Sequence, residues 1–543
     1  MFNWKLILYS KLVLLFLISN NAWAAISIPS SGVIDKSAPI ITKETLPEES
    51  LGLSRPVPEL PKEQVGGPQV LINGIKFVGN TVVSDSRLKA VIAGQLDKEH
   101  SFSSLKNIAI QVTRWYRKEG YLMATAFLPR QDLADNTLII EILEGFLGEI
   151  HLTESGRLRG EYLLKYLTPL EKKAINSNAI ERQLRLLSDR GVAVQATFSP
   201  GKKLGTADLS VAVTELPVLQ GNVTLDNKGN KFTNSNRAGV VVQINDPLGF
   251  GTRSLVSMVS GGRNYQYFAL DLEVPISFDG LVFKVSASDT HYILGEEFSV
   301  LDAHGASQGF KLGLKYPWKR SLVESIYSEI GINHNHYEDH SLGATTSMRT
   351  ITSLRAGFNG NLVKGGARID WQLLGTFGAM DDSVQNVPVE GRFSKLELSV
   401  DYNKLLNNSV RLQTTLNAQF SANNLASAQK MALGGAQGVR AYPQGEGLVD
   451  VGLLAKTELS VQVNINITVS GFFDYGIGKF EKHSVSLEQE NNKTLSGLGA
   501  ALSLHHQSYG DMSLSASWRT GAAPSSGADK VPRIWLQWIR PFN

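Results

Sequence analysis

The chain of 543 residues contains no cysteine. Disulfides, iron–sulfur clusters and thiolate metal sites are therefore excluded, and the redox compartment stays open. An excess of charge of one sign is also missing, because 53 basic and 50 acidic residues leave a formal net charge of +3. So small an excess argues against a protein held on nucleic acid by a basic face.

Long apolar runs are scarce as well. The main one, residues 12–18, follows Lys5 and Lys11 and precedes Ala22-Trp-Ala24. This order is typical of a secretory signal peptide removed after residue 24. An uncleaved anchor is the alternative, but the run is shorter than the ~20 residues of a spanning helix. Any further role in a membrane must therefore come through strands.

Motifs of common enzymes are not evident either. We identify no phosphate-binding loop, no zinc-protease motif and no nucleophile elbow. The pair His505-His506 has no neighbouring ligand residues. The sequence therefore predicts no catalytic residues, no metal site, no cofactor and no enzyme activity.

What is present begins with a proline-rich segment. Seven of the nineteen prolines fall within residues 25–69. Few apolar residues are periodic there, so we expect an extended linker. A short helix near residues 31–38 is only weakly signalled.

Two similar modules follow the linker. Residues 70–145 predict a β-α-α-β-β order, with strands over 70–78, 121–128 and 137–143, and helices over 84–96 and 103–119, the second capped by Ser103. Residues 146–217 repeat this order, with strands over 147–152, 192–198 and 207–213, and helices over 159–167 and 178–188. The recurrence indicates an internal repeat of architecture.

Residues 218–543 read as strands in which apolar and polar positions alternate. Examples lie at 268–274, 396–403, 459–467 and 512–518. A soluble sandwich gives the same alternation. Strands of about nine to ten residues, connections that alternate between short (246–251) and long (336–346), and aromatics near strand ends (Tyr316, Trp318, Trp535, Trp538) favour a membrane barrel instead. At roughly 20 residues per strand and connection, the region predicts sixteen antiparallel strands. The fold class is mainly β, with two α+β modules before the barrel.

Short motifs in these regions resemble one known family. They are Phe77-Val-Gly-Asn80, Tyr116-Arg-Lys-Glu-Gly-Tyr121, Ala126-Phe-Leu-Pro-Arg-Gln131 and Ile140-Glu-Ile-Leu-Glu-Gly145 in the first module, Leu184 to Gly191 with Pro200-Gly201 in the second, and Gly438-Val-Arg-Ala-Tyr442 and Phe472-Phe-Asp-Tyr-Gly476 in the barrel. Together and in this order they resemble the outer-membrane transporters of two-partner (type Vb) secretion. These form the haemolysin secretion/activation branch of the superfamily that includes the outer-membrane assembly insertases. The modules look like POTRA domains.

The resemblance implies a loop tip at Gly438, Val439, Arg440, Ala441 and Tyr442 and an inner-wall partner at Phe472, Asp474 and Gly476. An arginine inside a barrel needs a partner, and Asp474 shares strand parity with Phe472, so we expect an Arg440–Asp474 lock. A solvent-exposed Arg440 on an external loop is the alternative. Ala441 stands where the family usually has glycine, and a positive φ there would strain the turn.

Three further interpretations stay open. Glu458 either joins the lumenal network or is one lumenal acid among many. Tyr442 either packs the loop on the wall or is an interface aromatic. Tyr121, Phe127 and Leu128 in the first module either bind the substrate at a sheet edge by β-augmentation or pack the core.

The resemblance implies a Gram-negative outer-membrane protein with periplasmic POTRA domains. We expect a monomer in lipid and lipopolysaccharide, with no nucleic-acid partner, that captures an unfolded large exoprotein (an adhesin, haemolysin or contact-dependent inhibition toxin) and passes it through the barrel. An insertase that assembles other barrels is the main alternative. A passive porin would lack the modules, and a barrel lipase would need a Ser-His constellation. The family often has an N-terminal helix that plugs the barrel, and the proline-rich segment leaves this feature open.

Overall fold

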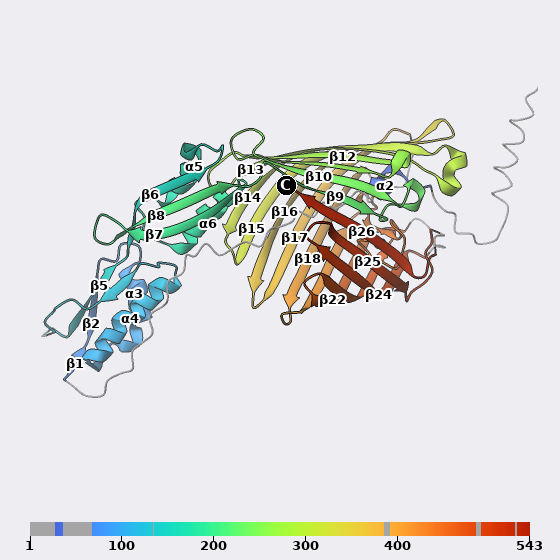
Figure 1. The fold of residues 1–543 in the computed structure, drawn as a ribbon. Helices are drawn as coiled ribbons and strands as arrows, with labels where there is room; N and C mark the ends of the chain where they lie inside the picture. Colours follow the sequence, from blue (N-terminus) through green and yellow to red (C-terminus); the bar gives the residue numbers. More distant parts are fainter. Residues whose placement is uncertain (1–27, 36–67, 134, 385–390, 485–489, 527–528) are drawn as a thin grey trace, which may run out of the picture.

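The structure, a computed structural model, describes residues 28–35, 68–133, 135–384, 391–484, 490–526 and 529–543. The predicted signal peptide and most of the predicted linker lie outside these residues. Figure 1 shows a barrel with two small modules in line at one of its ends, the first module being the farther from the barrel. Within the described ranges, no helix is long and apolar enough to cross a bilayer.

The first module is built around β5, which lies between parallel β2 and antiparallel β4. Its elements are β1 (Gln69–Ile72), β2 (Gly74–Val78), α3 (Asp85–Val91), a 3₁₀ turn (Ala93–Gln95), β3 (Lys98–Ser101), α4 (Phe102–Lys118), β4 (Thr125–Phe127) and β5 (Thr137–Leu143). The apolar face of α4, which includes Leu105, Ile108 and Val112, is buried against the sheet side of the module.

Two predictions for this module were wrong in detail, and one strand was missed. The predicted strand over 70–78 is two strands, because the N–H groups of Asn73 and Gly74 both donate to the carbonyl of Asn136 and the chain bends there. The first part, β1, then pairs with β3, a strand between the helices that the sequence did not indicate. The cap of α4 is Ser101, which accepts from the N–H of Ser104 at 3.2 Å, instead of Ser103.

The second module has the predicted β-α-α-β-β order. Its elements are β6 (Phe146–Ser155), α5 (Gly160–Leu167), a 3₁₀ turn (Thr168–Leu170), α6 (Ser177–Ser188), β7 (Val192–Pro200) and β8 (Thr206–Glu215). β8 lies between parallel β6 and antiparallel β7, which is the topology of the first module. The Asn176 side chain caps α6 by accepting from the N–H groups of Asn178 and Ala179.

The C-terminal region is a closed antiparallel barrel of sixteen strands, and the predicted fold class is confirmed. Its strands are β9 (Leu219–Asp226), β10 (Arg237–Asn245), β11 (Arg253–Ser260), β12 (Tyr265–Pro275), β13 (Val282–Ile293), β14 (His304–Arg320), β15 (Glu324–Ser341), β16 (Ala344–Lys364), β17 (Ala367–Asp382), β18 (Arg392–Leu405), β19 (Val410–Ser421), β22 (Val451–Asn464), β23 (Ile467–Lys479), β24 (Asn492–His506), β25 (Gly510–Arg519) and β26 (Arg533–Phe542). The barrel closes where β26 pairs with β9. Closure leaves no unpaired strand edge in lipid.

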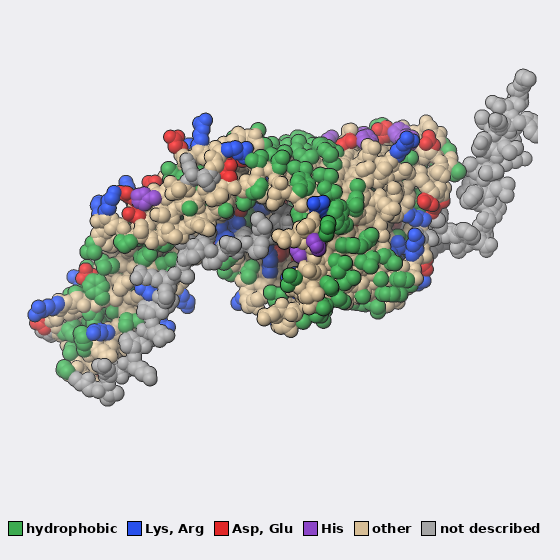
Figure 2. All heavy atoms as spheres, in the orientation of Figure 1, with side chains coloured by type: hydrophobic (Ala, Val, Ile, Leu, Met, Phe, Trp, Pro, Cys, Tyr) green, Lys and Arg blue, Asp and Glu red, His purple; other side chains and the backbone are tan. Residues whose placement is uncertain are grey.

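Alternation along the strands separates a lumenal face from an outer face. On β12, Phe268 and Leu270 are 42% and 39% exposed, whereas Ala269 between them is 5% exposed. Figure 2 shows hydrophobic side chains gathered over the outside of the barrel. This is the surface that a membrane barrel presents to lipid.

Three predictions for the barrel were wrong. Residues 336–346 are not a long connection, since β15 and β16 continue to a two-residue turn at Leu342 and Gly343, both with positive φ. Residues 459–467 are not one strand, because a turn at Ile465 and Asn466 separates β22 from β23, and the N–H of Asn466 donates to the Asn464 side chain. Strands of up to 21 residues also exceed the predicted nine to ten.

The second module is fastened to the barrel turns. Arg320, at the end of β14, donates to both carboxylate oxygens of Asp189, at 2.9 and 3.2 Å. The N–H of Leu322 donates to Glu181 at 2.7 Å. The ring of Phe278, in the turn after β12, packs edge-on against Tyr166 with centroids 5.1 Å apart. We call this contact the module joint.

A short helix, α2 (Ser31–Asp35), lies against the barrel wall. Its first N–H, on Ser31, donates to Asp339 of β15 at 2.7 Å. Ile34 is fully buried among barrel side chains that include Tyr265 and Tyr292. The weakly signalled helix therefore exists and packs on the barrel, while residues 36–38 of the predicted segment lie outside the described part of the chain.

Candidate functional site: the tip loop and its inner-wall partners

The site is a loop between β19 and β22 that folds onto the inner wall of the barrel. At its base, β20 (Met431–Ala432) pairs with β21 (Leu448–Val449). We call residues 433–447 the tip loop. Three of its glycines, Gly435, Gly445 and Gly447, have positive φ and allow the tight path of the chain. Gly438 is needed for another reason, because a Cβ there would lie 2.2 Å from the carbonyl oxygen of Leu433.

Arg440 and Asp474 form the centre of the site. The Arg440 guanidinium donates to both carboxylate oxygens of Asp474, each at 2.9 Å, and the Arg440 backbone N–H donates to the same group at 3.0 Å. The side chains of Arg440 and Asp474 are 13% and 1% exposed. A bidentate, buried pair of this kind fixes both position and orientation. The structure thus brings together the two residues that the sequence singled out.

Further groups complete the network around Arg440. Its guanidinium also donates to Glu458 of β22 at 2.7 Å and lies 3.3 Å from the centre of the Phe472 ring. Lys456, next to Asp474 in the register of β22 and β23, donates to the carbonyl of Gln437 at 3.0 Å. Two cations and two carboxylates therefore balance, as a buried charged site requires. Glu458 joins the lumenal network.

The backbone of the tip is also held by β25 and β26, which lie two and three strands along the barrel from β23. The carbonyl of Arg440 accepts from Ser517 Oγ of β25 at 2.7 Å and from Trp535 Nε1 of β26 at 2.8 Å. Trp535 lies near the start of β26, as predicted, but it is 6% exposed and faces the lumen, where it holds the tip loop. Strand parity gives the reason, since Ile534 on the other face is 52% exposed.

The remaining tip residues pack on the wall. Val439 and Tyr442 are fully buried, and the Tyr442 hydroxyl donates to the carbonyl of Ala522 at 2.8 Å, so Tyr442 packs the loop. The Cβ of Ala441 lies 2.5 Å from where a Cβ on Gly497 would be. Ala441 does not have a positive φ, so alanine causes no backbone strain there. Gly476 leaves room for Val439. A Cβ added at Gly476 would lie only 3.2 Å from Cγ2 of Val439.

Sequence reasoning missed a second anchor at the exit of the tip loop. The Glu446 carboxylate is 3% exposed as a residue, pairs with Lys493 of β24 at 2.9 Å, and accepts from the N–H and hydroxyl of Ser525 at 2.8 and 2.6 Å. An acid in a glycine-rich loop is a weak signal by itself. The parity of Lys493 on β24 does not identify its partner, which lies 47 positions earlier in the chain.

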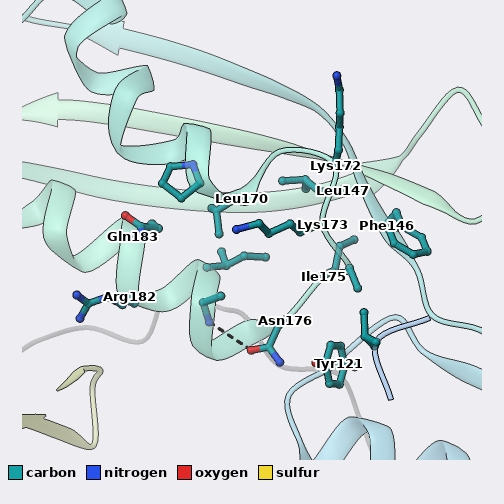
Figure 3. A pocket seen from close by; sticks show the side chains of 15 residues that line it. Tyr121, Phe146, Leu147, Leu170, Lys172, Lys173, Ile175, Asn176, Arg182 and Gln183 are labelled. Carbon is teal, nitrogen blue, oxygen red and sulfur yellow. Dashed lines mark hydrogen bonds between the residues drawn. The ribbon is translucent and has the colours of Figure 1, made fainter. Parts of the chain in front are cut away.

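The three first-module candidates do not gather at one surface. Tyr121 stacks edge-on with Tyr116 and also lines a cleft toward the second module (Figure 3). Phe127 lies on β4 and is 37% exposed, while Leu128 packs on the module core. Burial of Tyr116, helped by its hydrogen bond to Glu144, raises the pKa of its hydroxyl far above the ordinary value. That hydroxyl is a structural donor of the core.

Within the described residues, no group of three or more His, Asp or Glu side chains could hold a metal ion. Residues 305–309 do have the G-x-S-x-G spacing that the sequence reading passed over. A nucleophile elbow requires a strand-to-helix turn, whereas Ser307 lies within β14 and pairs with Thr290 and Tyr337 of the neighbouring strands.

Comparison with known proteins gives a consistent result. Residues 205–504 match the family described as haemolysin secretion/activation protein ShlB/FhaC/HecB, and residues 70–145 match the ShlB-type POTRA domain. The heme/hemopexin transporter protein HuxB of Haemophilus influenzae strain 86-028NP is 29% identical over 506 residues, covering 89% of this chain and 88% of that protein.

Two further relatives share the name CdiB. The outer membrane transporter CdiB of Escherichia coli O6:K15:H31 is 25% identical over 465 residues, covering 80% of this chain and 77% of that protein. The solved structure of CdiB from Escherichia coli superposes with a TM-score of 0.76 at 22% identity, covering 91% of this chain and 94% of that one. This likeness confirms the fold.

Proposed function

Because the chain belongs to the haemolysin secretion/activation family ShlB/FhaC/HecB, we propose that it is the outer-membrane transporter of a two-partner secretion system. In this proposal its POTRA domains, residues 70–145 and 146–217, lie in the periplasm and receive an unfolded exoprotein. The barrel, residues 218–543, then passes that exoprotein to the cell surface. It acts as a monomer in lipid and lipopolysaccharide, after removal of residues 1–24.

The observation that carries the proposal is the tip loop fastened inside a closed barrel, whose one end carries a docked module. The hydrogen bonds of Arg440 to Asp474 and Glu458 hold the tip loop inside the lumen, against the wall strands β22 and β23. A passive pore needs neither that loop nor the modules. The relatives named transporters support the same role.

We infer the class of the exoprotein from the family and from the names of its relatives. One relative is named a heme/hemopexin transporter and another an outer membrane transporter CdiB. The cargo we propose is a large secreted polypeptide such as an adhesin, a haemolysin or a contact-dependent inhibition toxin. No nucleic acid, metal or cofactor takes part in this step.

Deletion of the gene in its host tests the function. We expect the medium to lose one large exoprotein, and the export of that exoprotein to return when the gene is restored. Other outer-membrane barrels, measured by their heat-modifiable mobility, are expected to assemble normally. If those barrels fail and no exoprotein depends on this protein, it is an insertase and the proposal is wrong.

A further inference from the structure

Half of the ten histidines in the chain lie on one part of the barrel wall. They belong to β13, β14 and β15, and we call them the histidine face: His291, His304, His334, His336 and His340. The strand register makes His304 and His340 direct neighbours, and their rings stack with centroids 5.1 Å apart. Figure 2 shows histidines beside acidic side chains along the upper edge of the barrel, toward the end away from the modules.

The histidine face points away from the lumen. On β15, Tyr337 and Asp339 are buried on the lumenal side, so the histidines at the even positions of this strand face outward. On β13, Tyr292 is buried on the lumenal side and its hydroxyl donates to Asp339, so His291 next to it faces outward. His304 shares the face of its partner on β15.

The histidine face begins where the apolar surface of the barrel ends. Leu312, Ile332 and Leu354 form one outward row on β14, β15 and β16, and they are 38%, 55% and 44% exposed. From His334 to His340, every outward residue of β15 is polar. This end of β15 is the one away from the module joint, so it lies on the cell-surface side of the outer membrane. The histidine face is therefore level with the headgroups of the outer leaflet, where lipopolysaccharide resides.

The charge of this surface depends on its histidines. Within β13–β16, all of whose residues are described, the outward positions above the apolar row hold no lysine and no arginine. They hold two carboxylates, and each is paired with a histidine. Glu338 lies 2.8 Å from His340, and Asp289 lies 2.8 Å from His291. No permanent positive charge therefore balances these two acids.

The neighbouring elements add three charges. Asp381 of β17 faces outward two strands from His336, and Arg392 of β18 faces outward three strands from His334. Asp302 lies in the loop just before β14. When the histidines are neutral, carboxylates therefore outnumber cations here. Histidine gains its charge as the pH falls from neutral to about 5, and the cations then outnumber the carboxylates.

Two of the rings are already oriented. The Nδ1 atoms of His334 and His336 are hydrogen-bonded to the hydroxyls of Thr352 and Thr350 of β16, at 2.9 and 3.1 Å. The Nε2 atom of each ring is left for a ligand. Fixed rings reduce the ordering that a ligand must impose.

We propose that the histidine face binds the phosphate groups of lipopolysaccharide, and that it binds them more tightly as the pH falls. A protonated imidazole carries a charge and donates from both ring nitrogens, so it forms charge-assisted hydrogen bonds with phosphate oxygens. Near neutral pH the carboxylates repel the same phosphate groups. This inference uses the orientation of the barrel in the outer membrane and not the export of an exoprotein.

Binding of lipid A to the purified full chain in detergent micelles tests the proposal. One probe is fluorescently labelled lipid A with both phosphates, and the other is the same lipid after both have been removed. A chelator in all buffers removes divalent ions that would bridge carboxylates and phosphates. Affinity for the phosphorylated probe is expected to rise at least about fivefold between about pH 7.5 and about pH 5.5, whereas the dephosphorylated probe should show no rise.

The triple variant His334→Gln, His336→Gln and His340→Gln should lose most of this rise. The double variant His336→Lys and His340→Lys should bind the phosphorylated probe tightly at both pH values, because lysine stays charged. The matched control is His505→Gln with His506→Gln, at the end of β24 on the module side of the barrel, and it should keep the full rise.

An equal rise in the triple variant and in the control would overturn the proposal, and so would an equal rise with the dephosphorylated probe. Either result would leave the transport function untouched, because that function is tested separately by deletion of the gene and the loss of one exoprotein from the medium.

Discussion

Two arginine–aspartate pairs hold parts of this molecule to the barrel, and they differ in how they do so. Arg440–Asp474 fastens the tip loop inside the lumen, and Arg320–Asp189 fastens the second module at the module joint. Both have a closest N–O distance of 2.9 Å. The carboxylates differ in exposure, because the side chain of Asp474 is 1% and that of Asp189 29% exposed, whereas both arginines are largely buried, Arg440 at 13% and Arg320 at 7%.

The difference in burial implies a difference in consequence. Removing one member of a buried pair leaves an uncompensated charge, which costs about 3–5 kcal/mol. A pair that is partly open to water costs less when broken, because water hydrates the remaining charge. Breaking the lumenal pair should therefore release the tip loop, whereas breaking the pair at the module joint should only loosen the second module.

The largest expected effect on export comes from the lock, and it should differ between the two carboxylates that bind Arg440. Asp474 receives three hydrogen bonds from Arg440 and Glu458 receives one. Asp474→Asn should therefore reduce export of the exoprotein by more than about tenfold, and Glu458→Gln should reduce it only a few-fold. Export is measured in the medium at matched outer-membrane levels. Equal losses from the two variants would mean that the pairing geometry is unimportant.

A wedge between the loop and the wall should have the next largest effect. Gly497 of β24 faces Ala441, and even a Cβ there would lie 2.5 Å from the Cβ of Ala441. Gly497→Val should displace the tip, reduce export by roughly fivefold and raise ion conductance in planar bilayers. Gly471→Val is the matched control on β23, because a Cβ at that glycine meets nothing within 4 Å. Normal export by Gly497→Val would place the tip away from this wall during transport.

A break at the module joint should have a moderate effect. Arg320→Met keeps much of the apolar stem but removes the charge, so the second module should move more freely on the barrel. We expect a two- to threefold loss of export and faster hydrogen exchange in α6, measured by mass spectrometry. Lys319→Met is the neighbouring control, since Lys319 pairs with Glu324 in its own turn instead of the module. Unchanged exchange in Arg320→Met would show that the pair does not fasten the joint.

A fall in pH should also loosen the module joint, as Arg320→Met does. Burial by itself would raise the pKa of Asp189, but the charge and hydrogen bonds of Arg320 outweigh burial and lower that pKa. A carboxylate with a lowered folded pKa contributes stability above its unfolded pKa and loses it as pH falls through the folded pKa. Hydrogen exchange in α6, corrected for its intrinsic pH dependence, should therefore stay constant from neutral pH to about 5 and rise below about 4. Asp189→Asn should remove that rise.

The smallest expected effect concerns a single hydroxyl. Tyr442→Phe removes one hydrogen bond, to the carbonyl of Ala522, and keeps the buried ring. The net contribution of such a bond is about 1 kcal/mol. The tip keeps its other anchors, so export should fall by less than about twofold. A loss as large as that of Asp474→Asn would mean that the hydroxyl, and not the charge pair, holds the loop.

The sequence was most informative where the signal is local or periodic. Alternation placed Asp474 on the inner face, and the sixteen strands followed from the length of the region. Pairs that join distant positions were not predictable from spacing: Arg320 lies 131 positions from Asp189, and Glu446 lies 47 positions from Lys493. The break at Asn73 was missed because tertiary pairing of β1 with β3 decides it.

The most direct test of the lumenal lock is export by Arg440→Ala and Arg440→Lys at matched outer-membrane levels. Alanine removes the charge, and lysine keeps the charge but lacks the planar fork that binds Asp474 with two nitrogens. The account predicts that alanine stops export while the barrel still inserts, and that lysine gives an intermediate value. Export by Arg440→Ala at the unsubstituted rate would contradict it, and the tip loop would then have no part in transport.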